Sequence, residues 1–231
     1  MPAEWLVDLA WASLALTFAC AVGIAIDIYG QGFRLPMPVM EIVWPVTALY
    51  FGPVAVWAYV RFGRPASHRW QREHGVDRAP DTHGWASVAV GVSHCGAGCT
   101  LGDIAAEFAV FGLGLSVAGT ALPFEYAGDY LLAVALGLIF QFFAIAPMRG
   151  LGVREGLVAA VKADILSLSA FEVGLFAWMA LTAFVFYPAP HHLHPDSPVY
   201  WLLMQAGMVI GFATAWPANV WLLHRGIKEA M

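Results

Sequence analysis

The chain has 231 residues, of which 60% are hydrophobic and only 12% are charged, and its mean hydropathy is +0.70. A soluble domain of this length does not stay dissolved with so apolar a composition, so lipid must be the solvent for most of its surface. The net charge of −5 gives no support for a nucleic-acid partner.

Apolar runs of roughly 20 residues recur along the chain, and a helix of that length spans the ~30 Å hydrocarbon layer of a bilayer. The runs lack the period-two alternation of barrel strands, which favours helices. We therefore expect an all-α, polytopic transmembrane bundle of about six helices in one domain. The predicted spans lie near residues 5–28, 39–62, 85–118, 125–147, 154–187 and 198–223.

Basic residues predict the orientation, because Lys and Arg collect on the cytoplasmic side of a membrane. The connection after the second predicted span is rich in arginine, and Arg149, Arg154, Arg225 and Lys228 follow later even-numbered spans. The connections on the opposite side contain no Lys or Arg except Arg34. With six spans, the N and C termini are both expected in the cytoplasm.

The third predicted span contains the most informative polar residues. Cys95, Cys99, Asp103 and Glu107 are spaced four apart, so on a helix they form one stripe, and His94 lies on its flank. An acidic residue at the bilayer centre costs about 2.5–3.5 kcal/mol on insertion scales. The stripe is therefore expected to face the protein interior or a water-filled cavity.

Packing alone offers another interpretation of the same segment. Gly98 and Gly102 form a GxxxG pair, which lets neighbouring helix backbones approach closely, and the last span repeats this spacing. Buried thiols are often inert fillers, and Cys20, among apolar residues of the first span, is expected to be one. A disulfide between Cys95 and Cys99 would strain a regular helix, so no disulfide framework is expected.

The fifth predicted span supplies a second polar set with three charged residues, and such residues seldom lie in a membrane without partners. In the predicted topology the third and fifth spans run in the same direction, so the two sets meet at similar depth. Lys162 has the alternative of snorkelling to the headgroups. The set comprises Lys162, Asp164, Ser167, Ser169 and Glu172, and Gln141, Gln205, Met208 and Asn219 extend it from other spans.

These residues favour a protein that handles a transition-metal cation. Thiolate and imidazole ligands suit Cu(I) and Zn(II), and carboxylates extend the choice to iron. We expect a permease or intramembrane binding protein, with copper favoured, and the lipid bilayer as its surroundings. The expected metal ligands are His94, Cys95, Cys99, Asp103 and Glu172, with Glu107, Lys162 and Asp164 for proton or charge coupling.

A histidine cluster in the predicted external loop is a candidate for metal capture. His191, His192 and His194 lie within four residues, although histidine tracts also bind metals adventitiously. Two other functions stay open. One is a membrane oxidoreductase that uses a bound metal or the Cys95 and Cys99 pair, although the sequence has no haem or flavin motif. The other is a non-catalytic assembly subunit.

The segment Ser-His-Cys-Gly-Ala-Gly-Cys-Thr-Leu-Gly-Asp, at residues 93–103, resembles the signature of a bacterial membrane-protein family catalogued as a domain of unknown function. Further similar stretches cover most of residues 85–231, whereas the first two predicted spans fall outside them. The resemblance implies a multi-pass protein of the bacterial cytoplasmic membrane. It implies no activity, cofactor or catalytic residue.

Overall fold

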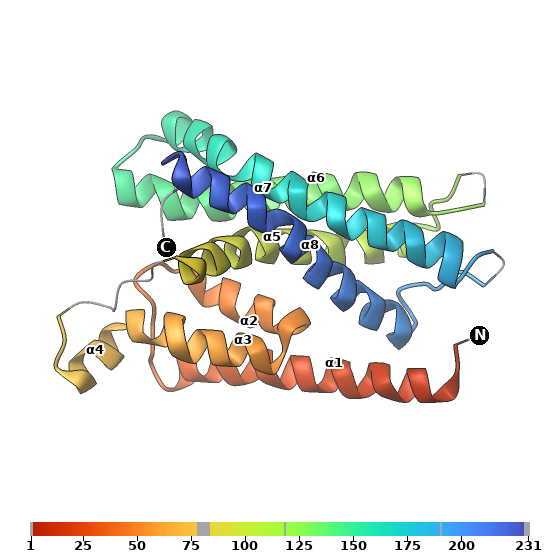
Figure 1. Ribbon diagram of the computed structural model, residues 1–231, viewed down its shortest axis with the longest axis horizontal. Coiled ribbons are helices and arrows are strands. Elements are labelled where there is room, and N and C mark those ends of the chain that lie inside the picture. Colours follow the sequence, from red (N-terminus) through yellow and green to blue (C-terminus); the bar gives the residue numbers. More distant parts are fainter. Residues whose placement is uncertain (1, 78–83, 118, 190, 229–231) are drawn as a thin grey trace.

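The computed structural model describes residues 2–77, 84–117, 119–189 and 191–228, and these form an all-α bundle (Figure 1). Five helical segments in this part of the chain are long and apolar enough to cross a membrane, so the protein is of the membrane type. They are Glu4–Gly30, Trp85–Leu113, Leu122–Ala146, Val153–Phe186 and Pro198–His224.

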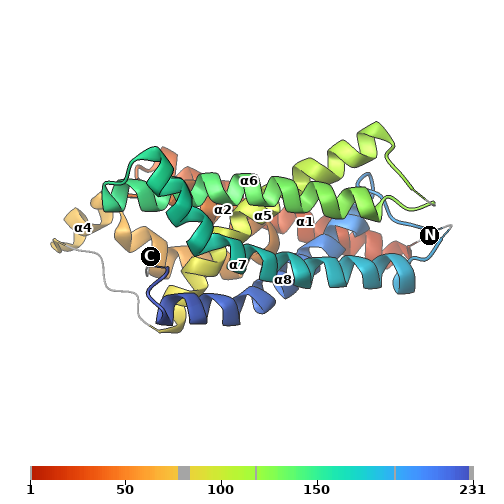
Figure 2. The ribbon, with the colours of Figure 1, turned by 90° about the horizontal axis from the view of Figure 1, so that it is seen from above.

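The crossing helices lie nearly side by side along the length of the bundle (Figures 1 and 2). Their bounds are α1 Glu4–Ala25, α5 Trp85–Leu113, α6 Leu122–Arg149, α7 Val153–Leu181 and α8 Pro198–His224. Two of them continue as wider helical turns, α1 through η1 Ile26–Gly30 and α7 through η4 Thr182–Phe186. The third and fifth predicted spans therefore form long helices with no break near a glycine.

The segment predicted as the second span, residues 39–62, does not cross the bundle. It forms α2 (Met40–Phe51) and α3 (Pro53–Ala58), which meet at Gly52. Gly52 has φ +53°, a conformation that glycine adopts at little cost, and Pro53 begins the second helix. The 12 residues of α2 rise only about 18 Å, which is too short for the hydrocarbon layer.

The arms of this hairpin pack closely and return to the end of the bundle from which α2 began (Figure 1). The rings of Trp44 on α2 and Tyr59 on η2 (Tyr59–Gly63) are 5.9 Å apart in an edge-to-face contact. At the tip, the Gln205 amide of α8 donates a hydrogen bond to the Leu49 carbonyl at 2.8 Å. A helix that ends inside a membrane protein needs such a donor for its last carbonyls.

The count of crossings changes the predicted topology. With five crossings rather than six, the N-terminal end of α1 and the C-terminal end of α8 lie at opposite ends of the bundle (Figures 1 and 2). Five crossings would place the two ends of the chain on opposite sides of a membrane, and the side that each terminus faces stays a prediction. The hairpin also returns the chain to the end where η1 finishes, because Arg69 on α4 (His68–His74) lies over the ring of Phe33, the residue before Arg34.

Candidate functional site

Helix α5 occupies the centre of the bundle and packs against α2, α6, α7 and α8. The predicted stripe of Cys95, Cys99, Asp103 and Glu107 is completely buried, at 0% exposure for each residue. The four-residue spacing keeps these side chains on one face of a continuous helix, as the sequence suggested. The stripe therefore runs through the interior of the protein and does not face lipid.

Glycines allow the close helix packing that buries the stripe. A methyl group added to Gly102 would lie 2.5 Å from the backbone nitrogen of Ala133 on α6, and one added to Gly98 would lie 2.9 Å from Gly137. On α8, the same addition at Gly211 would lie 2.8 Å from the Phe171 carbonyl of α7. Both GxxxG pairs thus lie at helix contacts, in agreement with the packing interpretation of these glycines.

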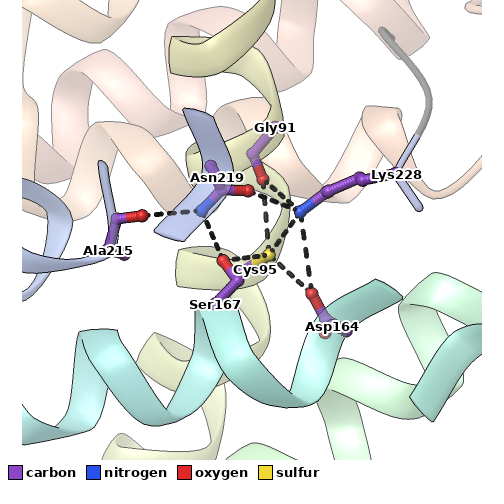
Figure 3. A network of polar contacts seen from close by, with 7 residues as sticks. All are labelled: Gly91, Cys95, Asp164, Ser167, Ala215, Asn219 and Lys228. Carbon is purple, nitrogen blue, oxygen red and sulfur yellow. Dashed lines mark hydrogen bonds and ion pairs between the residues drawn. The ribbon is translucent and has the colours of Figure 1, made fainter. Parts of the chain in front are cut away.

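A polar network surrounds Cys95 near the C-terminal end of the bundle (Figure 3). The thiol donates a hydrogen bond to Asp164 Oδ1 at 2.6 Å, and the Ser167 hydroxyl donates one to Cys95 Sγ at 3.1 Å. The Asn219 amide of α8 donates to Ser167 Oγ and, at 2.9 Å, to the Ala215 carbonyl. These bonds join α5, α7 and α8 at one level.

The ammonium of Lys228 enters this network from beyond the end of α8. Its Nζ lies 2.8 Å from Cys95 Sγ, 2.9 Å from Asn219 Oδ1 and 3.1 Å from the Gly91 carbonyl oxygen. Asp164 Oδ1 is 3.8 Å away and forms an ion pair with it. We call the four acceptor atoms, on Gly91, Cys95, Asp164 and Asn219, the lysine site.

Halfway along α5, the second thiol lies among carboxyl groups. Glu172 on α7 and Asp103 are electrostatic neighbours of Cys99. The carboxyl oxygens of Asp103 and Glu172 are buried and have no hydrogen-bond partner of normal geometry among the described groups. Ionisable side chains buried within a membrane bundle are candidates for a functional role, and these two carboxyl groups lie beside the Cys99 thiol.

The row of carboxyl groups continues toward the other end of the bundle. Asp129 on α6 neighbours Asp103, Glu172 and Glu107, and Glu107 in turn neighbours Glu125 and Tyr200. The oxygens of Asp129 and Glu107 have no hydrogen-bond partner of normal geometry among the described residues, although the two carboxyl groups neighbour each other. We call this series the buried polar row: Cys95, Cys99, Asp103, Glu107, Asp129 and Glu172.

A cavity of about 410 Å³ lies where the row ends. Its lining includes carboxyl, imidazole, phenol and thioether groups, and we call it the His-lined cavity. The groups that concern the row are Glu125, Met179, His192, His194, Tyr200 and Met204. The row therefore connects this cavity with the lysine site at the opposite end of α5.

Other predicted residues lie outside these groups. Lys162 is exposed and lines a surface groove with Arg149, Arg154 and Glu155, so it does not accompany Asp164. His191 is exposed and is not part of the cavity lining, unlike its two neighbours. His94 is fully buried, and neither ring nitrogen has a hydrogen-bond partner among the described groups.

Several residues of the site are missing from the sequence-based prediction. The sequence predicts Lys228 to lie in the tail after the last span, and only the return of the chain past Gly226 brings it into the bundle. Glu125 and Asp129 carry a signal that could have identified them, because they lie four apart on an apolar helix, as the α5 residues do. The cysteines are all free, as expected.

The donor groups do not converge on one point. Among the residues that the structure describes, no three His, Cys, Asp or Glu side chains are grouped so that they could hold one metal ion. The donors instead follow one another along the bundle.

The family model described as Domain of unknown function (DUF4396) matches residues 84–228. The chain belongs to this family. The match covers α5 to α8, the buried polar row and the lysine site, whereas α1 to α4 lie outside it. No curated protein and no solved structure matches the chain. The function must therefore be argued from the site.

Proposed function

We propose that the protein is a permease for a soft transition-metal cation, with copper in the Cu(I) state as the favoured cargo. The observation that carries the proposal is the buried polar row, which links the His-lined cavity to the lysine site through groups that can hold a positive charge. Acidic groups within a membrane bundle mark cation or proton routes, because burial of so many carboxyls is otherwise unfavourable.

The donor types support a soft cation. Thiols of Cys95 and Cys99 lie on the row, and the thioethers of Met179 and Met204 lie beside His192 in the cavity. Thiolate and thioether groups select Cu(I), whereas hard cations prefer oxygen ligands alone. Donors placed in series, and not in one closed group, suit a cation that must bind weakly enough to leave.

The hairpin of α2 and α3 is a feature of the fold that also supports the proposed permease. Helices that end within the membrane occur where the backbone is buried in protein or lines a cavity, and they are typical of transporters. The tip brings the Tyr50 hydroxyl beside the α5 face that carries both thiols, because a methyl group on Gly96 would lie 3.0 Å from it. The Tyr50 hydroxyl is buried and has no hydrogen-bond partner of normal geometry among the described groups.

For the orientation we propose a cytoplasmic C-terminal end and an external N-terminal end of α1, in a bacterial cytoplasmic membrane. The connections at residues 119–121 and 188–197 contain no Lys or Arg. Arg34, the exception in a six-span topology, lies at the basic end, because the ring of the preceding Phe33 contacts Arg64 and Arg69. This distribution fits the positive-inside rule.

Single cysteines test the orientation on intact cells. In a background without native cysteines, a membrane-impermeant maleimide is expected to label His191→Cys and not Glu73→Cys, since both positions are exposed but lie at opposite ends. Labelling of Glu73→Cys alone would reverse the proposed orientation. Lysed cells, in which both variants should react, serve as the control.

Copper uptake into proteoliposomes tests the proposed function. Under anaerobic, reducing conditions, vesicles with the protein are expected to accumulate Cu(I) above protein-free vesicles. The Cys95→Ser/Cys99→Ser variant is expected to be slower by at least about tenfold, because hydroxyl oxygen is a poor ligand for Cu(I). The control is Cys20→Ser, which changes a half-buried thiol on α1.

Equal uptake by protein-containing and protein-free vesicles would contradict the permease. Purified protein that carries no copper and co-purifies with stoichiometric partners would instead favour the assembly subunit.

A further inference from the structure

Lys228 is held by the kind of atoms that surround a bound cation. Its side chain is fully buried, and acceptors from α5, α7 and α8 surround the ammonium (Figure 3). They are a thiol sulfur, a carboxylate oxygen, an amide oxygen and a backbone carbonyl, on Cys95, Asp164, Asn219 and Gly91. The ammonium thus lies in a mixed sulfur and oxygen shell that would also suit a small cation of one positive charge.

The shell is held together without the lysine. Cys95 is bonded to Asp164 and Ser167, and Asn219 is bonded to Ser167 and to the Ala215 carbonyl. These residues belong to long helices packed along their length, and Figure 3 shows the bonds running from helix to helix. The donor atoms therefore keep their positions when the ammonium leaves.

The lysine itself is attached through a short turn at the end of α8. The helix ends at His224, Gly226 has φ +65°, and the backbone nitrogens of Ile227 and Lys228 both donate to the Leu222 carbonyl. Gly226 and Ile227 line the surface groove near α7. Lys228 is therefore joined to the long helices only through the few residues of this turn.

Charge balance decides what can replace the ammonium. Without it, Asp164 would be buried with no positive partner, and its Oδ2 already lacks a hydrogen bond among the described groups. A buried unpaired charge is strongly unfavourable, so the lysine leaves readily only when another single positive charge enters. A sulfur and oxygen shell favours a soft univalent metal ion for this exchange. When the Cys95 sulfur binds the metal, its proton passes along the existing hydrogen bond to Asp164, so the net charge of the site is unchanged.

We propose that the lysine site is a binding site for a soft univalent metal cation, and that Lys228 occupies it in cis until such a cation displaces the ammonium. The proposal rests on the proposed function for the class of cation. In this proposal the turn after α8, at residues 225–228, blocks one end of the buried polar row until the transported cation displaces Lys228.

Amine labelling tests the displacement in the unmodified chain. The sequence has two lysines, of which Lys162 is exposed and Lys228 is buried. In detergent, an amine-acetylating reagent is expected to modify Lys162 alone, and saturating Ag(I), used as a stable probe for Cu(I), is expected to make Lys228 react as well. Peptide mass spectrometry measures both sites. A Lys228 that stays unreactive with Ag(I) would overturn the proposal.

Binding affinity tests the competition between lysine and metal. In a Cys20→Ser/Cys99→Ser background, Cys95 is the single thiol, and equilibrium dialysis measures its Ag(I) dissociation constant. Lys228→Leu, which adds no metal ligand, is expected to tighten binding by at least about tenfold, because the site no longer has to be vacated. Lys162→Leu is the matched control and should change nothing. Adding Cys95→Ser should abolish the tight binding.

The two proposals fail in different ways. Equal Ag(I) affinity with and without Lys228, or tight Ag(I) binding that survives Cys95→Ser, would overturn the metal site. The permease would then still be tested separately by the uptake assay. Ag(I)-dependent labelling of Lys228 without copper uptake would support the metal site and overturn the permease.

Discussion

Replacing Asp164 by Asn is expected to destabilise the protein by about 3–5 kcal/mol, since it leaves a buried ammonium without its carboxylate. Both side chains of the Asp164–Lys228 pair are almost completely buried, and their charged atoms are 3.8 Å apart. The asparagine keeps the size of the side chain, so packing should change little. Thermal or denaturant unfolding in one detergent measures the loss.

A double-mutant cycle separates the ion pair from other effects of the substitution. Asp164→Asn/Lys228→Met removes both charges and is expected to be more stable than Asp164→Asn alone, because no unpaired charge remains. Glu73→Gln is the surface control. It breaks the exposed pair of Arg69 and Glu73, at 2.7 Å, and should have no measurable effect. Additive losses in the cycle would contradict a functional pairing of Asp164 with Lys228.

Hydropathy predicted the long helices because membrane spans depend mainly on local composition. It did not predict the hairpin, since α2 and α3 together are as long and apolar as one span. Two local signals pointed to it. Gly52 and Pro53 interrupt the middle of the predicted span, and this pair ends one helix and begins another. The second signal was Arg34, a basic residue in a connection on the side of the six-span topology that otherwise contains no basic residue.

The α5 stripe was predictable because its geometry is local. Residues four apart on a helix share a face whatever surrounds them, so the burial of the whole stripe follows from the cost of Asp103 and Glu107 in lipid. Their partners depend on how the other helices pack. Asp129 faces α5 only because the glycine contacts set the register of α6. The position of the Lys228 side chain depends on a single turn after α8, and no periodic sequence pattern predicts such a turn.

Neutralising the centre of the buried polar row is expected to reduce copper uptake by about 100-fold, which corresponds to about 2.8 kcal/mol. The variant is Asp103→Asn/Glu172→Gln, which keeps the side-chain sizes and removes both groups that can compensate a cation beside Cys99. Electrostatic stabilisation inside a protein is far stronger than in water, so the loss cannot be made up by solvent. Proteoliposome uptake rates measure it, with the exposed Glu155→Gln on α7 as the control.

Stability distinguishes this role from a structural one. The oxygens of Asp103 and Glu172 make no hydrogen bond of normal geometry to the described groups, and Glu172→Gln keeps a polar group beside the Cys99 thiol. The amide side chains of the variant cannot ionise, so they also remove electrostatic repulsion among the buried carboxyl groups. The double variant is therefore expected to unfold at the same temperature as the parent or higher, while uptake falls. Loss of stability with undiminished uptake per folded protein would assign these carboxyls to helix assembly instead.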